Sequence, residues 1–178
     1  SADHLCMSYY YSFNMPITIL RPFNTYGPRQ STRAIIPSLI TQALRNSSVN
    51  VGSLYPTRDF VHVTDTVQGF VKTISSKKAI GEVINLGTGF EISIKDLIKI
   101  ISKIIKKEII TKSKKERKRP VKSEVDRLLA SNKKAKRILN WIPKYSKQKG
   151  LISGLTSTIN WYKIDKNLIN FKTKNFTY

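Results

Sequence analysis

The sequence predicts an α/β fold in which helices and short apolar strands alternate along the chain. Residues 17–20, "ITIL", are apolar at every position, which is typical of a parallel strand covered on both faces. After Ser93 the apolar residues recur at helical spacing, with lysines on the opposite side. Glycine- and proline-containing turns separate such segments, which gives the alternating order of helices and strands.

The first quarter of the chain predicts a helix, a strand, a loop and a second helix. Residues 2–13 read as a helix that ends before Pro16, because the residue before a proline avoids the helical region. The strand 17–20 then leads into "RPFNTYGPRQ", residues 21–30, whose prolines, glycine and asparagine predict a loop. Residues 35–44 are expected to be helical, with Pro37 tolerated in the first turn.

The middle of the chain predicts two more strand–helix units. Residues 58–63, "RDFVHV", are expected to form a strand, and Asp65 is expected to cap the helix that follows, "TVQGFVKTI". Residues 81–89, "GEVINLGTG", predict a strand and a glycine turn. Ser93 and Asp96 form an S-x-x-D capping signal for a helix whose apolar face is Ile94, Leu97, Ile98, Ile101 and Ile105. "EIIT", residues 108–111, predicts a further strand.

The last third of the chain predicts a basic loop and two helices. Residues 112–120, "KSKKERKRP", form a charge run that is typical of a solvated loop. Ser131 or Asn132 is expected to start a helix that continues to Leu139. Residues Leu151, Leu155, Ile159 and Tyr162 are spaced as the buried face of a final helix. A polar tail is expected over residues 163–178.

Composition limits the classes of protein that the chain can represent. Hydrophobic residues make up 40% of the 178, and no apolar run approaches the roughly 18 residues that a membrane span needs. A single cysteine, Cys6, cannot form an internal disulfide, which fits a cytoplasmic protein. The formal net charge of +21 attracts anions. Compositional drift, a small anionic ligand and nucleic acid are all open explanations, but residues 99–122 carry the charge without any aromatic residue, which makes nucleic acid unlikely.

Arginines and amides, rather than acids and histidines, are the candidate binding residues. His4 and His62 have no metal ligands near them at suitable spacing, and Asp59 and Asp65 are expected to fix a loop and cap a helix. Asn24 and Asn85 follow apolar strands, at the edge where α/β sheets bind ligands. The arginines next to turns and strand ends suit bidentate contacts with phosphate; these are Arg29, Arg33, Arg58 and Arg119. The sequence therefore predicts a phosphate-bearing ligand held by strand-end loops.

Five segments in order resemble one family. "SADHL", "RPFNTYGPRQ", "RDFVHVTDTVQGF", "INLGTG" and the pair "RP" and "KAKRILNWIPKY" resemble the carboxyl-terminal half of NAD-dependent nucleotide-sugar epimerase/dehydratases, which are extended short-chain dehydrogenase/reductases. The resemblance implies the last part of a Rossmann-type parallel sheet plus a small carboxyl-terminal substrate-binding α/β subdomain over residues 1–162. The glycine-rich cofactor loop and the catalytic Tyr-x-x-x-Lys pair of the family are expected upstream of Ser1, so we expect no turnover from this chain alone, whether it is a truncated product, a partial sequence or one piece of a split enzyme.

Within the family, "NTYGPRQSTRAIIP", "GSLYPTRDF" and "RPVKSEVDRLLASN" look most similar to N-acetylglucosamine nucleotide 4,6-dehydratases of legionaminic-acid-type pathways. The resemblance implies oxidation of the sugar at C4 by NAD, or NADP, loss of water across C5 and C6, and return of the hydride to C6. A nucleotide-sugar 4-epimerase remains the alternative activity. A basic nucleic-acid-binding protein is the alternative from another class.

The resemblance also assigns roles to single residues. No catalytic residue of the family falls within the chain. The cofactor-binding residues would be Pro22 and Phe23. The residues that would bind the nucleotide-diphosphate sugar are Asn24, Ala34, Ile35, Val51, Arg58, Asn85, Arg119 and Ser123. Two departures from the family pattern matter: "VKSE" stands where an acidic residue commonly follows R-P, and in "LNW" Asn140 must adopt the backbone conformation of the usual glycine.

The resemblance further implies a homodimer of the full-length enzyme. In the family the helix at residues 2–13 would join a four-helix interface between two subunits. Its apolar and aromatic residues would suit the protein core equally well, so the sequence leaves the two alternatives open.

Overall fold

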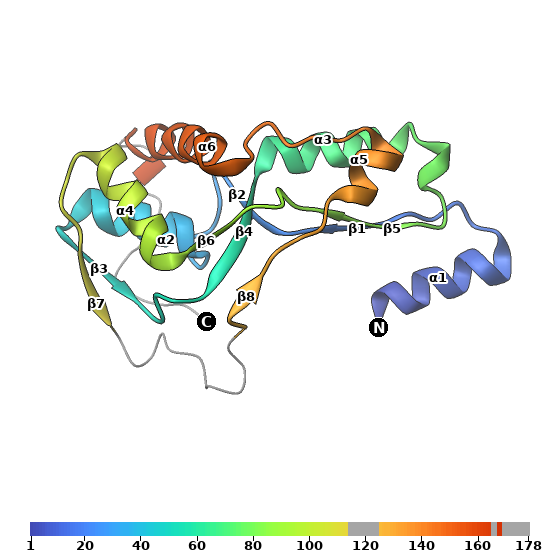
Figure 1. The fold of residues 1–178 in the computed structure, drawn as a ribbon, viewed down its shortest axis with the longest axis horizontal. Helices are drawn as coiled ribbons and strands as arrows, with labels where there is room; N and C mark the ends of the chain where they lie inside the picture. Colours follow the sequence, from blue (N-terminus) through green and yellow to red (C-terminus); the bar gives the residue numbers. More distant parts are fainter. Residues whose placement is uncertain (114–124, 165–166, 169–178) are drawn as a thin grey trace.

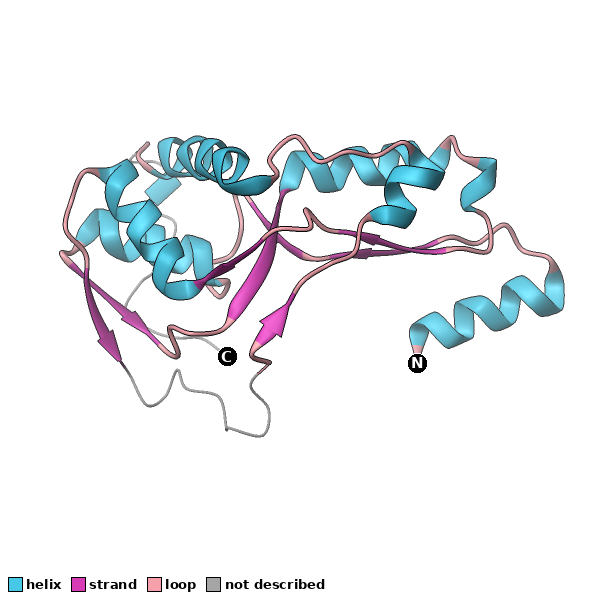
Figure 2. Cartoon of the chain, viewed as in Figure 1, coloured by secondary structure: helices cyan, strands magenta, loops and turns pink. Residues whose placement is uncertain are grey.

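The structure is a computed structural model that describes residues 1–113, 125–164 and 167–168 (Figure 1). Helices and strands alternate, which confirms the predicted α/β class (Figure 2). The helices are α1 (Ala2–Phe13), α2 (Ile35–Arg45), α3 (Val63–Ile74), the short 3-10 helix η1 (Lys77–Ala79), α4 (Ile94–Ile105), α5 (Lys133–Leu139) and α6 (Lys147–Tyr162). The strands are β1 (Ile19–Pro22), β2 (Asn24–Tyr26), β3 (Ser48–Val51), β4 (Thr57–His62), β5 (Val83–Leu86), β6 (Glu91–Ser93), β7 (Ile110–Ser113) and β8 (Arg127–Leu128).

The strands form three small sheets. β1 pairs with β5 in parallel, with Ile19 opposite Val83 and Pro22 opposite Leu86. β4 lies at the centre of the largest sheet, where it pairs in parallel with β2 and β8 and antiparallel with β6. β3 and β7 form a separate parallel pair. α3 and α5 lie over the β1–β5 pair, and α2, α4 and α6 gather at the opposite end of the molecule (Figure 1).

Two hydrophobic clusters hold these elements together, and β4 contributes to both. The larger cluster contains buried residues of α2, β3, α4 and α6, and Phe60 of β4 belongs to it. The smaller cluster lies between β5 and α5, and the neighbouring Val61 belongs to that one. Successive side chains of a strand point to opposite faces. β4 therefore separates the two clusters and fixes their relative position.

The helix boundaries follow the signals in the sequence. Ser93 Oγ accepts a hydrogen bond from the amide of Asp96, 3.1 Å away, and so caps α4 as predicted. α1 ends at Asn14, which adopts a left-handed backbone with φ 53°. Asn140 ends α5 with φ 48°, in the conformation that glycine favours, and this confirms the expectation for "LNW".

The strand predictions around residues 17–30 need correction. The strand expected at 17–20 is β1, Ile19–Pro22, and the predicted loop 21–30 contains the end of β1 and all of β2. The sequence does not predict β3, β6 or β8, and β7 is shifted by two residues towards the carboxyl terminus relative to "EIIT", which it overlaps. These strands have two to four residues, so the strand that each one pairs with determines where it begins and ends. β6, for example, forms where Glu91 pairs with Asp59 of β4.

Asp65 does not cap α3, contrary to the prediction. α3 begins at Val63, and the residue before it, His62, accepts the amide hydrogen of Thr64 at Nδ1. Asp65 therefore lies within the first turn. Its two carboxylate oxygens accept the amides of Lys144 and Tyr145, each at 2.9 Å, and so hold the segment that leads into α6.

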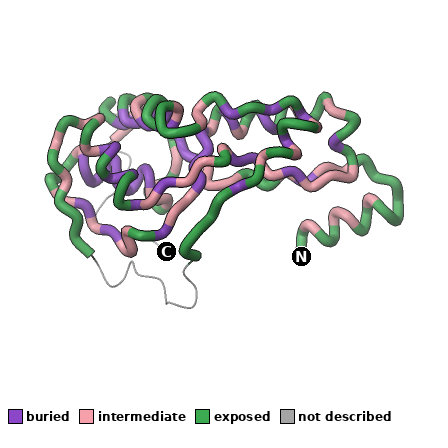
Figure 3. The backbone as a smooth tube through the Cα atoms, viewed as in Figure 1, coloured by how far each residue is buried: buried purple, intermediate pink, exposed green. Residues whose placement is uncertain are grey.

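α1 lies apart from both clusters and has no buried residue (Figure 3). Its contacts with the rest of the chain include the Asp3–Arg21 ion pair and Tyr10, which packs over Gly81. Within the described residues this helix belongs to neither hydrophobic cluster, and its role stays a prediction. Most of the predicted basic loop and polar tail, 114–124, 165–166 and 169–178, lies outside the described residues. No helix in the described part is long and apolar enough to cross a membrane.

Candidate functional site

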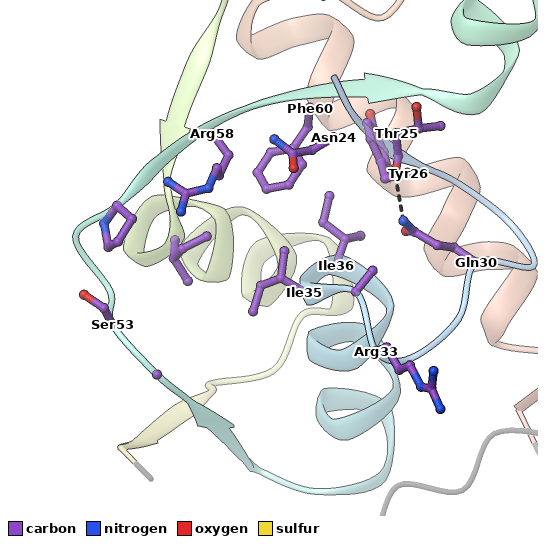
Figure 4. Close-up of a pocket in the computed structure, with 14 residues that line it drawn as sticks. Asn24, Thr25, Tyr26, Gln30, Arg33, Ile35, Ile36, Ser53, Arg58 and Phe60 are labelled. Carbon is purple, nitrogen blue, oxygen red and sulfur yellow. Dashed lines mark hydrogen bonds between the residues drawn. The ribbon is translucent and has the colours of Figure 1, made fainter. Parts of the chain in front are cut away.

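A pocket of about 450 Å³ opens between β2, β4 and the beginning of α2 (Figure 4). It lies where chain segments far apart in sequence meet: the start of β2, the loop before α2, the turn after β3, β4 and the first residue of α4. The residues that line it are Asn24, Thr25, Tyr26, Gln30, Arg33, Ala34, Ile35, Ile36, Gly52, Ser53, Pro56, Arg58, Phe60 and Ile94.

The strand side of the pocket is polar and cationic. Nη1 of Arg58 donates hydrogen bonds to the carbonyls of Thr57, at 2.8 Å, and Val125, at 2.7 Å. Nδ2 of Asn24 lies 3.3 Å from the carbonyl of Asp59, which orients the amide beside β4. Because β2 and β4 run parallel, with Asn24 opposite Phe60, the guanidinium and the amide lie on the same wall of the pocket (Figure 4).

The helix side of the pocket presents the amino terminus of α2. Ala34 precedes the helix with an extended backbone, and within the described residues no side chain caps this end. The first amides of a helix point outward and carry partial positive charge. The amides that begin α2 therefore add to the attraction of Arg58 for an anion.

The remaining wall is apolar. Phe60, Ile35, Ile94 and Pro56 line it. A flat, partly apolar group could pack on this wall while an attached anion met the polar residues. Arg33 also lines the pocket, but in Figure 4 its guanidinium points away from the other labelled side chains.

The structure brings four of the predicted substrate residues into this pocket: Asn24, Ala34, Ile35 and Arg58. Val51 is fully buried in the larger cluster, and its successors Gly52 and Ser53 line the pocket instead. Asn85 lies in β5 opposite Arg21 and does not line the pocket. Pro22 and Phe23 immediately precede Asn24 at the end of β1. Arg119 and Ser123 lie outside the described residues.

Sequence reasoning did not assign Gln30, Ser53 or Phe60 to the site. Phe60 had a detectable signal, because it is two residues after Arg58 on a strand and so shares its face. Gln30 had none. Its side chain donates to the carbonyl of Thr25 at 2.6 Å, while its own carbonyl accepts from the Tyr162 hydroxyl at 2.7 Å. These bonds fix the loop before α2 to β2 and to α6.

Behind the pocket lies a buried polar group that contains Tyr26 and His62. Their rings meet edge to face at 5.3 Å. Burial raises the pKa of the Tyr26 hydroxyl above its usual value and lowers the pKa of His62, although Asp65 opposes the shift of the histidine. Both side chains are therefore neutral at pH 7. Among the described residues no three His, Cys, Asp or Glu side chains gather as a metal site requires.

Comparison with known proteins gives consistent results. Residues 1–153 match the family described as GDP-mannose 4,6 dehydratase. The human dTDP-D-glucose 4,6-dehydratase is 33% identical over 178 residues, covering 97% of this chain and 48% of that protein. Curated relatives that align with nearly all of this chain are about twice as long, so the chain spans about half of their length.

Solved structures agree with this match. The UDP-glucuronic acid 4-epimerase of Bacillus cereus, solved with UDP-glucuronic acid and NAD, superimposes with a TM-score of 0.81 at 34% identity. That superposition covers 92% of this chain and 50% of the epimerase. The dTDP-glucose 4,6-dehydratase of Bacillus anthracis, solved with NAD, gives a TM-score of 0.81 at 27% identity, covering 96% of this chain and 51% of that structure. The chain thus belongs to the NAD-dependent nucleotide-sugar epimerase/dehydratase family, the extended short-chain dehydrogenase/reductases.

Proposed function

We propose that this chain is the carboxyl-terminal, substrate-binding half of a nucleotide-sugar 4,6-dehydratase and that its pocket holds the nucleotide diphosphate. The observation that carries the proposal is the convergence of Asn24, Arg58 and the amino terminus of α2 on one pocket. Three separate segments supply these groups, and all three favour an anion. The finer assignment, to an N-acetylglucosamine nucleotide, rests on sequence resemblance.

Within this proposal each part of the pocket has a distinct task. The Arg58 guanidinium and the Asn24 amide bind the diphosphate, whose two negative charges suit a charge-assisted grip. The backbone at Ala34 and Ile35 contacts the nucleoside. The apolar wall around Phe60 excludes water from one face of the base or ribose. Arg119 and Ser123 would complete the grip on the diphosphate and sugar.

The positions of the two residues proposed for the cofactor support this proposal. Pro22 is exposed at the carboxyl end of β1, the edge of a parallel pair at which dinucleotides bind in α/β sheets. Phe23 is half-buried beside Gly87, which fixes its position at that edge. When bound, NAD would accept the hydride from sugar C4 and return it at C6. The chain's own contribution there is to orient the nicotinamide end.

A binding experiment tests the nucleotide site directly. Isothermal titration of the chain with UDP and with dTDP should show binding, and Arg58→Ala should weaken it by about tenfold or more, because one charged hydrogen bond contributes roughly 1.5–3 kcal/mol. Arg137→Ala is the matched control, since Arg137 is exposed on α5 and does not line the pocket. Equal losses in the two variants would show that Arg58 contributes only general positive charge.

A turnover experiment tests the division of labour. The chain with NAD and a UDP- or dTDP-sugar should give no 4-keto-6-deoxy product. Product formed by this polypeptide alone would contradict the proposal that the catalytic pair lies elsewhere. Added polypeptide carrying the glycine-rich loop and Tyr-x-x-x-Lys should restore turnover. A 4-keto-6-deoxy sugar then identifies a dehydratase, whereas a C4 epimer with its hydroxyls intact identifies a 4-epimerase.

A further inference from the structure

Asp59 is a buried carboxylate that the proposed binding of nucleotide diphosphate does not use. It has no exposed surface, and its oxygens accept hydrogen bonds from two other segments. Oδ1 accepts from the amide and the hydroxyl of Thr88, at 2.9 and 2.6 Å. Oδ2 accepts from the amides of Gly89, at 2.9 Å, and Ala130, at 3.3 Å. One side chain of β4 thereby joins the turn after β5 to residue 130.

Ala130 ends a segment, residues 125–130, that we call the strap. The strap lies alongside β4, where the amide of Thr57 donates to the carbonyl of Asp126 at 2.8 Å. Arg127 of the strap forms an ion pair with Glu91 of β6. At its first residue the carbonyl of Val125 accepts from Arg58 Nη1 at 2.7 Å. The strap thus starts at the pocket arginine and ends at Asp59.

Asp59, the turn after β5 and the strap are closely packed at Gly87. A Cβ atom added to Gly87 would lie 2.1 Å from the Ala130 Cβ and 3.0 Å from Asp59 Oδ2. The first distance is shorter than real Cβ atoms show, and the second is at the tight end of their contacts, so the turn, the carboxylate and the strap pack directly against one another.

Arg58 and Asp59 are neighbours on β4, so their side chains leave opposite faces of the strand. Arg58 lines the pocket, whereas Asp59 holds the strap and the turn on the other side. The strap returns to the pocket face and places the Val125 carbonyl on the arginine. We propose that Asp59 is a positioning residue that acts through the strap to set the Arg58 guanidinium for a diphosphate-bearing ligand, an inference that rests on the proposed function.

A double-mutant cycle on UDP affinity tests this role. Asp59→Asn keeps the shape of the side chain but turns one acceptor into an NH₂ group that faces two donors. It should weaken UDP binding by about tenfold, and it should have almost no further effect in the Arg58→Ala background, because coupled residues are not additive. Equal losses in both backgrounds, or no loss in either, would overturn the proposal. Asp96→Asn, an exposed carboxyl on α4, is the control and should leave affinity unchanged.

A ligand-free measurement separates this inference from the proposed function. Asp59→Asn should speed amide hydrogen exchange at Thr57, whose amide donates a hydrogen bond to Asp126 of the strap. The exchange rate at the amide of Ser38 in α2 should stay unchanged. If the wild type binds neither UDP nor dTDP, the proposed function fails, and the exchange data alone decide whether Asp59 holds the strap. Should Asp59→Asn not fold, Thr88→Val serves in both experiments: it removes the 2.6 Å bond to Asp59 together with the hydroxyl's bonds to the backbone of Phe90, at 3.1 and 3.2 Å, and leaves the carboxylate itself intact. Unchanged exchange at Thr57 in the folded variant would contradict the positioning role.

Discussion

The pocket region and the strand-pair region of this molecule differ in how far they bury their apolar residues. The pocket region, β2–β4–β6 with α2, α4 and α6, encloses the larger hydrophobic cluster between helices and strands. The strand-pair region, β1–β5 with α3 and α5, encloses the smaller cluster on one face of two strands. α3 also exposes an apolar stripe of Val67, Phe70, Val71 and Ile74. The first region buries its apolar residues itself, and the second leaves surface that a partner element could cover.

Stability and association arise in different regions of the molecule. A two-stranded sheet buries little area, and a stable unit needs further strands or helices on it. We therefore expect the pocket region to dominate the free energy of unfolding and the exposed stripe of α3 to contribute to self-association. The predictions below test this division, from the largest expected change in stability to the smallest.

The largest effect should come from the centre of the pocket region. Leu155→Ala removes a fully buried side chain of α6 and leaves a cavity, which typically costs about 2–5 kcal/mol. Ile74→Ala, at an α3 position that is 86% exposed, should change stability by no more than about 0.5 kcal/mol. Urea denaturation measures both. Similar losses in the two variants would break the comparison.

A smaller effect should come from the cap of α4. Ser93→Ala removes the oxygen that accepts the Asp96 amide and should cost about 1 kcal/mol. Ser146 precedes α6 in the same way but makes no capping bond with its side chain, so Ser146→Ala is the matched control. Thermal unfolding of the pair should show a lower midpoint for Ser93→Ala only.

pH should act at the junction of the two regions, where β4 runs into α3. Burial holds the pKa of His62 below its ordinary 6.5, so the unfolded chain binds this proton more readily than the folded chain. Stability contributed by neutral His62 is therefore present above pH 6.5 and declines as the pH falls from there towards the folded-state pKa. Denaturation at pH 7.5 and pH values below 6.5 measures it. His62→Asn keeps a capping acceptor and should flatten this slope; an unaltered slope would assign it to other groups.

The smallest change in stability should accompany the largest change in association. Phe70→Glu with Ile74→Glu breaks the exposed stripe of α3 and should alter stability by no more than about 0.5 kcal/mol. Light scattering at equal concentration should fall, because the uncovered apolar surface drives self-association. A wild-type chain that is already a compact monomer would show that the stripe is not an association surface.

Much of the helical structure could be predicted because its signals are local. The Ser93–Asp96 cap, the apolar face of α4, the spacing from Leu151 to Tyr162 and the turn at Asn140 each lie within a few residues of the element they define. The short strands could not be predicted in the same way. β6 and β8 acquire their structure from pairing with β4, and no local pattern states which partner is present.

The same distinction applies to the site. The sequence identified Asn24 and Arg58 by residue type and by their position at strand ends, but it gave Asp65 the role of a cap that His62 fills. The error arose because capping depends on where the helix begins, and the pairing of β4 with β2 continues to His62. The sequence also predicted that Asp59 fixes a loop, but it did not indicate which loops Asp59 contacts or how far they lie from Arg58.

The amino-acid sequence alone indicated the family, the helices and the chemical character of several pocket residues, since motifs and periodicity are local properties of the chain. The tertiary structure was needed to show that Asn24, Arg58 and the start of α2 share one pocket. It also showed that Val51 is buried in the larger cluster while Gly52 and Ser53 line the pocket, and that Asp59 accepts a hydrogen bond from the strap. The physical reason is that such contacts join residues as many as 71 positions apart, and their geometry follows from packing rather than from any local propensity.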